Sequence, residues 1–271
     1  MTSLSMASSK PWYIYSPVHI LFGEGMLTRL PAAAISLGER ALMVTGPKVS
    51  QLPPVQQAIE KLRETLQMFI SYDRIDSEPT TKQVNEVADL AREKKVQVII
   101  GLGGGSPMDA AKAAGVVAAQ GGTAEEYLSG CRKMSDVRIP VITVPTTAGT
   151  GAEVSKGAIL TWREKKIKSG LRGDALFAYQ AIIDPSLTSF LPSKIVAMTG
   201  FDVFCHATET YVSKASSPIT SCLSLNAIES VCTCLPQLLK NLQNEEARIQ
   251  LSFHSTMMGL NLANSTTCLP H

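Results

Sequence analysis

Two hydrophobic patterns that alternate between residues 39 and 145 constrain the fold of this chain more than any other feature. Four short aliphatic and β-branched runs are typical of buried strands, at residues 41–46, 67–73, 96–102 and 139–145. Between the second and third runs, apolar residues recur at helical spacing from Val84 to Ala91 and would face a sheet. Strands that alternate with helices form parallel sheets with helical crossovers. We therefore expect a doubly wound, mainly parallel α/β sheet.

The strand patterns stop after residues 182–192, and long helical patterns follow at residues 221–243 and 245–265. This change predicts an α/β domain over residues 1–185 and an all-helical second domain over residues 186–271. The second domain is about half as long as the first and ends at Leu269-Pro270-His271 without a polar tail. We expect it to be truncated, with an incomplete helical bundle.

Composition narrows the classes of function. The 271 residues are 45% hydrophobic and 18% charged, with a formal net charge of +2, which is typical of a globular protein and gives no sign of nucleic-acid or membrane binding. The first twelve residues lack the features of a secretory signal, so we expect a cytoplasmic protein. The six cysteines form no CxxC pair and are expected to be reduced.

The third predicted strand runs into a glycine loop, Gly103-Gly104-Gly105-Ser106, and then into an alanine-rich helix. Ser106 suits the N-cap, Pro107 the first helical position and Asp109 the first turn. Backbone N–H groups of such a loop can approach an anion at the helix N-terminus, which suits a pyrophosphate. The loop completes neither GxGxxG nor a P-loop motif, so the glycines could instead serve only close helix packing.

The fourth predicted strand ends in a second loop, Thr146 to Ser155, in which hydroxyl groups and glycines alternate. We expect these residues to form a polar edge that exposes its backbone. Because both loops leave the carboxyl ends of parallel strands, they should converge where open α/β sheets bind ligands. Two converging polar loops suit a dinucleotide better than a single phosphate.

Four segments, GGGSPMDAAKA, PTTAGTGAEVS, IIDPSLT and GFDVFCHATETYVS, resemble the motifs of the iron-dependent, group III alcohol dehydrogenases in order and spacing. The resemblance runs from about Val18 to the last residue. It implies a dinucleotide-binding first domain and a metal-binding helical domain. The implied reaction transfers a hydride between NAD or NADP and a small alcohol or aldehyde, with a divalent metal as Lewis acid.

The resemblance also implies residue roles. Under this resemblance, the pyrophosphate binds to Gly103, Gly104, Gly105 and Ser106, and Asp109 lies at the start of the helix that follows them. Thr146, Thr147 and Ser155 are expected to line the cofactor cleft. Lys168 matches a lysine that contacts the cofactor in this family, although a solvated hairpin explains it equally well.

Gly46 stands where relatives that are restricted to NAD usually carry an acidic residue. Without that carboxylate, and with Lys48 nearby, a 2′-phosphate is not excluded, so NADP is as good a candidate as NAD. The alternative is that Gly46 is simply a turn glycine and carries no information about the cofactor.

Asp202 and His206 are four residues apart in a predicted helix and can share an ion on one face. Such a pair by itself is more typical of a surface hydrogen bond. The resemblance implies an aspartate and three histidines around Fe²⁺, and Asp202, His206 and His271 occupy three of the four places. Oxygen and imidazole ligands would also suit Zn²⁺. His254 matches no ligand position and is expected at the helix surface or partly in the core.

Two rival functions stay open at this stage. The chain could be a catalytically silent nucleotide-binding fragment, because the fourth metal ligand is missing. A lyase similar to the dehydroquinate synthases uses a comparable cleft, but its phosphate-binding residues are not visible. No catalytic general base is identified, the substrate is not readable, and a homo-oligomer stays open.

Overall fold

The computed structural model describes residues 11–75 and 77–268 of the chain. These residues divide into two compact units. The α/β unit consists of Pro17–Thr147 and Ala152–Phe190. The helical unit consists, within the described residues, of 11–16, 148–151 and 191–268. The domain boundary expected between residues 185 and 186 stays a prediction.

The α/β unit is built on a six-stranded sheet in the order β1-β8-β5-β4-β2-β3, and every neighbouring pair is parallel. The strands are β1 (His19–Phe22), β2 (Arg40–Thr45), β3 (Met68–Tyr72), β4 (Val98–Gly103), β5 (Val141–Pro145) and β8 (Gln180–Ile183). The four strands expected from the apolar runs are confirmed as β2, β3, β4 and β5. The parallel sheet confirms the predicted fold class.

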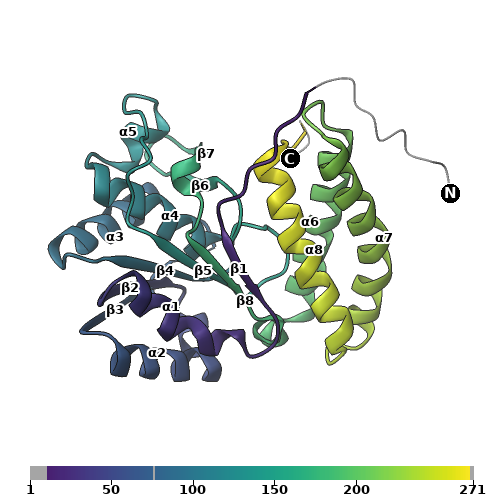
Figure 1. Cartoon of the computed structure of the whole chain (residues 1–271), viewed down its shortest axis with the longest axis horizontal. Coiled ribbons are helices and arrows are strands. Elements are labelled where there is room, and N and C mark those ends of the chain that lie inside the picture. Colours follow the sequence, from purple (N-terminus) through teal and green to yellow (C-terminus); the bar gives the residue numbers. More distant parts are fainter. Residues whose placement is uncertain (1–10, 76, 269–271) are drawn as a thin grey trace. The chain divides into compact units, whose positions relative to one another are not determined.

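Helices cover both faces of this sheet (Figure 1). On one face lie α1 (Leu30–Leu37) and α2 (Pro53–Thr65), and on the other lie α3 (Thr81–Glu93) and α4 (Gly105–Gln120). Side chains of β2 alternate accordingly, since Met43 joins the first core and Leu42 the second. The apolar positions of α3 from Val84 to Ala91 are buried against the sheet, as their spacing predicts.

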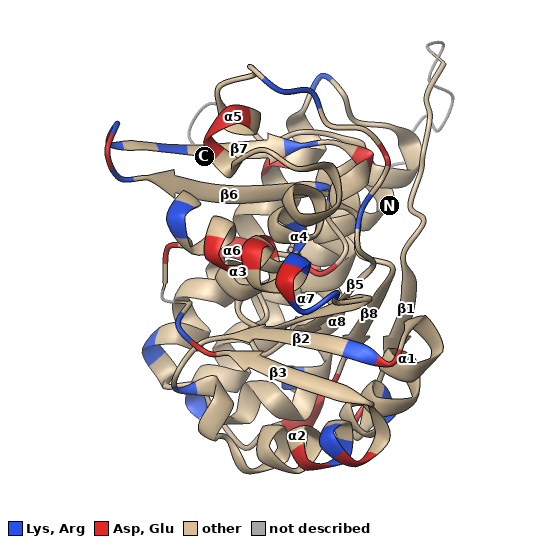
Figure 2. Ribbon diagram, turned by 90° about the vertical axis from the view of Figure 1, so that its left-hand side faces the viewer, with Lys and Arg blue, Asp and Glu red and all other residues tan. Residues whose placement is uncertain are grey.

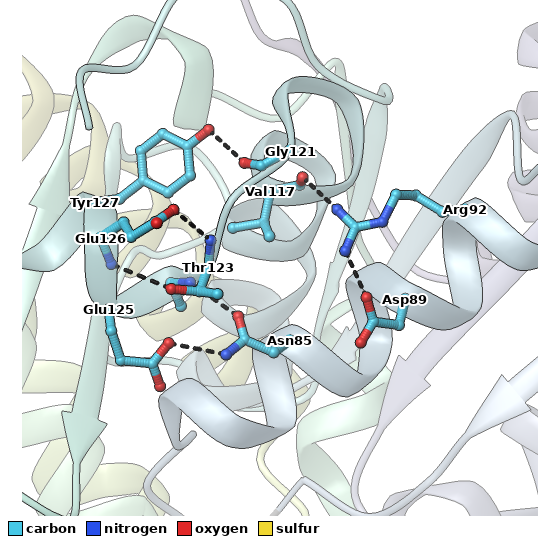
Figure 3. A network of polar contacts seen from close by, with 10 residues as sticks. Asn85, Asp89, Arg92, Val117, Gly121, Thr123, Glu125, Glu126 and Tyr127 are labelled. Atoms are coloured by element: carbon cyan, nitrogen blue, oxygen red, sulfur yellow. Dashed lines mark hydrogen bonds and ion pairs between the residues drawn. The ribbon is translucent and has the colours of Figure 1, made fainter. Parts of the chain in front are cut away.

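Polar contacts attach the short helix α5 (Ala124–Leu128) to α3 (Figure 3). Thr123 and Glu126 form a capping box at the start of α5. Asn85 of α3 accepts a hydrogen bond from the backbone N of Ala124 and donates one to Glu125, both at 2.8 Å. The connection between α4 and β5 is thereby held close to α3.

An antiparallel hairpin completes the α/β unit, formed by β6 (Gly157–Trp162) and β7 (Ile167–Arg172). In its register Thr161 lies opposite Lys168. The backbone N of Thr161 donates to the carbonyl of Pro79 at 2.9 Å, so the hairpin contacts the segment that precedes α3. Four 3-10 helices also occur: η1 (Met26–Arg29), η2 (Val49–Gln51), η3 (Asp174–Leu176) and η4 (Pro185–Phe190).

The helical unit contains α6 (Ser193–Val212), α7 (Pro218–Lys240) and α8 (Glu245–Asn264). All three helices contribute to one apolar core, which includes Val203, Val231 and Leu251. Among the described residues, α7 is the one helix long and apolar enough to cross a membrane, with a mean hydropathy of 1.3. A core helix of a bundle passes the same test, and α7 contributes Val231 to this core.

Candidate functional site

The glycine loop after β4 and the threonine loop after β5 lie side by side in the α/β unit. Gly103 is paired with Pro145 across the two strands, and the backbone N of Thr146 donates to the Gly103 carbonyl at 2.8 Å. A Cβ added to Gly104 would lie 3.5 Å from the Thr147 side chain. The two loops therefore form one continuous polar edge at the carboxyl end of the sheet, where open α/β folds bind ligands.

Helix α4 begins two residues earlier than a Ser106 cap would place it. Gly104 is its N-cap, so no side chain caps the helix, and Ser106 lies inside the first turn. The expectation that Ser106 is the N-cap is wrong, because its Oγ donates instead to the carbonyl of Ser77 at 2.7 Å. A glycine cap leaves the first backbone N–H groups of α4 without a side-chain acceptor, which is the arrangement that binds anions.

Asp109 does not lie in the first turn of α4, which contains no acidic residue, and this expectation is also wrong. Its side chain is turned into the protein, where Oδ1 lies 3.0 Å from Lys112 Nζ and Oδ2 accepts a hydrogen bond from the backbone N of Ile159 at 2.9 Å. Burial raises the pKa of Asp109, and the Lys112 ammonium opposes that rise. The carboxylate is thus engaged in the interior rather than at the glycine loop.

A pocket of about 550 Å³ lies beside the glycine loop, within the α/β unit. Three segments line it: the turn after β2, the turn after β3, and the turn of the hairpin, with Gly46, Pro47, Lys48, Val49, Ile75, Ser77, Glu78 and Arg163. Gly46 lies where the first two turns meet, and a Cβ there would be only 3.0 Å from the Ile75 carbonyl oxygen. The small size of Gly46 allows this close approach.

The described lining of this pocket carries two cations, Lys48 and Arg163, and one carboxylate, Glu78. Oε1 of Glu78 lies 3.2 Å from Nζ of Lys168 in β7, so the two side chains form an ion pair, and both are more than half exposed. Several Lys and Arg positions, coloured blue, lie along the hairpin formed by β6 and β7 in Figure 2. Our sequence reasoning missed Ser77, Glu78 and Arg163, because they belong to no motif and meet only through the fold.

The glycines of the second loop have a different role from the one expected. Gly149 and Gly151 group with the helical unit, where a Cβ on Gly149 would lie 2.7 Å from that of Thr199 in α6. Gly151 has φ +62°, and its added Cβ would lie 2.4 Å from the Cα of Gly259 in α8. Both are buried, so they permit close packing against helices and do not expose backbone. Ser155 lies beyond them and is half-buried.

Asp202 and His206 lie one turn apart on α6, as their spacing predicts. Asp202 Oδ1 and His206 Nε2 are 3.7 Å apart, and their side chains are 32% and 5% exposed. This separation is too wide for a hydrogen bond, yet two bonds of about 2.1 Å to one shared ion can span it. The pair therefore fits a divalent cation in both geometry and donor chemistry.

The described residues contain no group of three or more His, Cys, Asp or Glu side chains that could hold a metal ion. The predicted ligand His271 lies outside the described residues. Cys268 is described, and its backbone N donates to Oε2 of Glu209, one turn beyond His206, at 3.0 Å. His254 is buried in α8, so the surface position that we considered for it is wrong, and the core position is confirmed.

Family models match nearly the whole described chain. The model of iron-containing alcohol dehydrogenases matches residues 17–185, and the model of the C-terminal part of Fe-containing alcohol dehydrogenases matches residues 196–271. This chain belongs to the iron-containing alcohol dehydrogenase family.

Several members of the iron-containing alcohol dehydrogenase family resemble it over most of its length. Choline dehydrogenase of Bacillus subtilis is 31% identical over 94% of this chain, and long-chain-alcohol dehydrogenase 1 of Geobacillus thermodenitrificans is 33% identical over 90%. A sulfoacetaldehyde reductase from Bifidobacterium kashiwanohense, solved in complex with NAD⁺, is 30% identical and superposes with a TM-score of 0.92 over 97% of this chain.

The chain spans less than two thirds of the length of the first two relatives, 64% and 62% respectively. It covers 70% of the solved sulfoacetaldehyde reductase chain. The matched part contains the α/β unit, the hairpin and helices α6 to α8. The activities of the full-length relatives therefore come to this chain only as proposals.

Proposed function

We propose that this chain is the cofactor-binding and metal-binding part of an oxidoreductase that transfers a hydride between NAD(P) and a small alcohol or aldehyde. The observation that carries the proposal is the polar edge of the α/β unit, where two loops meet beside a pocket of about 550 Å³. Family membership and the NAD⁺ complex of the solved sulfoacetaldehyde reductase support it.

The pyrophosphate is proposed to bind to Gly103, Gly104, Gly105 and Ser106. There the uncapped N-terminus of α4 supplies backbone N–H donors and the positive end of the helix dipole. Thr146 is buried and holds the neighbouring loop through its backbone, whereas Thr147 is half-buried and can meet the cofactor. Ser155 and Lys168 complete the proposed set of cofactor residues. Asp109 is not proposed to contact the cofactor, because its carboxylate binds Lys112 and the backbone N of Ile159 in the interior.

The pocket next to the glycine loop is proposed to hold the adenosine ribose. Its cations, Lys48 and Arg163, have no ion-pair partner among the described residues, and a 2′-phosphate would supply one. Glu78 is the described carboxylate of the lining, and Lys168 already neutralises it. The charge of this pocket therefore favours acceptance of NADP beside NAD.

In the helical unit, Asp202, His206 and His271 are the proposed protein ligands of a divalent cation, with Fe²⁺ as the family's metal and Zn²⁺ chemically acceptable. When bound, such an ion supplies Lewis-acid stabilisation of charge on the substrate oxygen. The chain's own contribution is to hold an aspartate and a largely buried imidazole one turn apart on a rigid helix. We assign no general base.

A second candidate is a chain that binds the dinucleotide without turnover. The observation that favours it is the lack of a three-residue metal cluster among the described residues. The two candidates differ in metal-dependent turnover and agree on cofactor binding.

One experiment separates them. NADH and NADPH fluorescence titrations would first establish cofactor binding by the 271-residue chain. Anaerobic oxidation of each cofactor with Fe²⁺ and a panel of short aldehydes would then test catalysis. We expect binding of both cofactors and Fe²⁺-dependent oxidation. Binding without oxidation would select the silent binding chain, and no binding of either cofactor would reject both candidates.

A further inference from the structure

Lys112 is a buried cation that the proposed function does not use. Its side chain is 0% exposed, and its Nζ has three partners: Oδ1 of Asp109 at 3.0 Å, the carbonyl of Ala152 at 2.9 Å and the carbonyl of Gly157. Two N–H donors of Lys112 are hydrogen-bonded to backbone carbonyl groups, and Asp109 Oδ1 lies within ion-pair distance of the same ammonium group. A charge in this position is held in one place by its surroundings.

Asp109 extends the same set of contacts. Its Oδ1 contacts Lys112, and its Oδ2 accepts the hydrogen bond from the backbone N of Ile159. Together the two side chains of α4 bind three backbone groups, at residues 152, 157 and 159. Hydrogen bonds to charged groups are stronger than neutral ones and gain further from burial. The segment 152–159 is therefore firmly attached to α4.

This segment joins the second loop to the hairpin. It ends in β6, whose Thr161 lies opposite Lys168 of β7, and the hairpin turn carries Arg163 into the lining of the pocket. Both members of the ion pair lie on α4, and the N-terminus of this helix follows directly on the glycine loop. One buried pair thus connects the proposed pyrophosphate site to the strands that present two proposed cofactor cations.

We propose that Asp109 and Lys112 are positioning residues for the dinucleotide. The pair fixes the base of the β6–β7 hairpin to α4 and so holds Arg163 and Lys168 at the edge of the pocket. Lys112 is fully buried, so it acts through the hairpin and not by contact with the ligand. The inference rests on the proposed cofactor binding and adds the residues that organise it.

The test is the double variant Asp109→Leu/Lys112→Met. Replacing both members of a buried ion pair with apolar residues of similar size commonly preserves stability, whereas the three backbone groups lose their charged partners. We expect the Kd for NADPH to rise about tenfold or more, as when a residue that orients a ligand group is removed. Deuterium exchange should accelerate in residues 152–172 and stay unchanged in β4.

The matched control is Lys61→Met/Glu64→Leu, which removes an exposed pair of the same i,i+3 spacing on α2, 2.8 Å apart. It should leave both the Kd and the exchange pattern unchanged. A double-mutant cycle adds a readout that a merely structural role would not move. Lys168→Ala should weaken NADPH binding in the wild type and have a clearly smaller effect in the Asp109→Leu/Lys112→Met background.

A folded double variant that binds NADPH with the wild-type Kd overturns the proposal. If the double variant does not fold, amide exchange of the wild type decides. We expect the Ile159 amide to exchange as slowly as the core of α4, and exchange as fast as the exposed turn at residues 163–166 overturns the anchor. If the wild type binds neither NADH nor NADPH, the proposed function fails, and the exchange comparison alone decides whether the pair anchors the hairpin.

Discussion

Under the proposed function, single residues of the pocket decide which dinucleotide binds. The turn after β2 has Gly46 where a carboxylate would repel a 2′-phosphate, and it places Lys48 in the pocket lining. Arg163 reaches the same pocket from the hairpin. We therefore propose that the balance between these cations and Glu78 sets the preference between NADP and NAD.

Lys48→Ala tests this balance. The Kd for NADPH should rise about tenfold, since a hydrogen bond to a charged group contributes about 1.5–3 kcal/mol. The Kd for NADH should change less than about twofold, because its ribose offers no phosphate to Lys48. Fluorescence titration measures both constants, with Lys240→Ala in the helical unit as control. Equal losses for the two cofactors would contradict the assignment of Lys48 to the 2′-phosphate.

Gly151 shows a steric limit at the residue scale. Gly151→Ala should lower the free energy of unfolding by about 3 kcal/mol or more, since it adds a left-handed penalty and a clash with Gly259. Gly130 has φ +75° with no atom within 4 Å of an added Cβ, so Gly130→Ala should cost only about 1 kcal/mol. Urea unfolding compares the two variants. Equal costs would show that the close approach to α8 is unimportant.

His254 predicts a pH dependence of stability. Burial lowers the pKa of His254 from its usual value. The unfolded chain therefore binds a proton at this histidine more readily than the folded chain. The contribution of His254 to the free energy of unfolding is fully present above its unfolded pKa of about 6.5. This contribution is lost as the pH falls towards the folded pKa.

The measurement is urea unfolding with EDTA between pH 7.5 and 5.5. The variant His254→Gln should show a smaller loss of stability on acidification than the wild type. His19→Gln, at an exposed position, controls for loss of a histidine. A wild-type slope in His254→Gln would exclude this histidine as a source of the pH dependence.

At the scale of elements, the helix N-termini differ in whether a side chain caps their first N–H groups. Helices α3, α5 and α7 begin with side-chain capping boxes at Thr80, Thr123 and Ser217. Helix α4 begins at Gly104 with no side-chain cap. Helices α1, α2 and α6 also lack a side-chain cap, so the missing cap alone does not distinguish α4. Under the proposed function, the first N–H groups of α4 bind the pyrophosphate.

Gly104→Asp tests this difference. Gly104 has φ −73°, and an added Cβ would make only ordinary contacts, so the substitution should be tolerated. An aspartate cap should stabilise α4 by roughly a few tenths of a kcal/mol while it repels the pyrophosphate from the same N–H groups. We expect the Kd for NADH and NADPH to rise together, with no loss of thermal stability. Ser217→Asp at α7 is the control and should leave binding unchanged.

At the scale of the whole molecule, the two proposed binding functions belong to different units. The cofactor residues lie in the α/β unit, and Asp202 and His206 lie in the helical unit. Cytoplasmic location, the absence of membrane and nucleic-acid partners, and a homo-oligomeric state stay predictions. Separate units predict that metal binding and cofactor binding can be lost separately.

His206→Ala should therefore lower retained Fe²⁺ by at least about tenfold, because it removes a ligand from a small set. The Kd for NADPH should stay within about twofold of the wild type, since no proposed cofactor residue is changed. Metal analysis after anaerobic gel filtration measures the first quantity and fluorescence titration the second. His19→Ala, which removes an exposed histidine, should retain the metal. Unchanged iron in His206→Ala would remove the metal assignment.

Local patterns in the sequence were sufficient for four of the six strands of the sheet, for the positions of the two loops and for the helical spacing of Asp202 and His206. These features depend on residues close together in the chain, where hydrophobic periodicity and turn chemistry act directly. The prediction of Ser106 as a helix cap failed because α4 starts earlier, with Gly104 as its N-cap, and the Ser106 hydroxyl donates to the distant carbonyl of Ser77.

Burial and long-range approach were decided only by the tertiary structure. The sequence position of Asp109 predicts an exposed carboxylate in the first turn of a helix. In the structure, Asp109 and Lys112 are instead buried beneath a segment that lies about forty residues away in sequence. Glu78 and Lys168 meet across 90 positions, and Arg163 reaches the pocket from a hairpin. Such contacts follow from the order of strands and crossovers, which residue spacing does not encode. The sequence alone therefore determines the framework of the proposed cofactor site, and the packing of distant segments determines which charges line it.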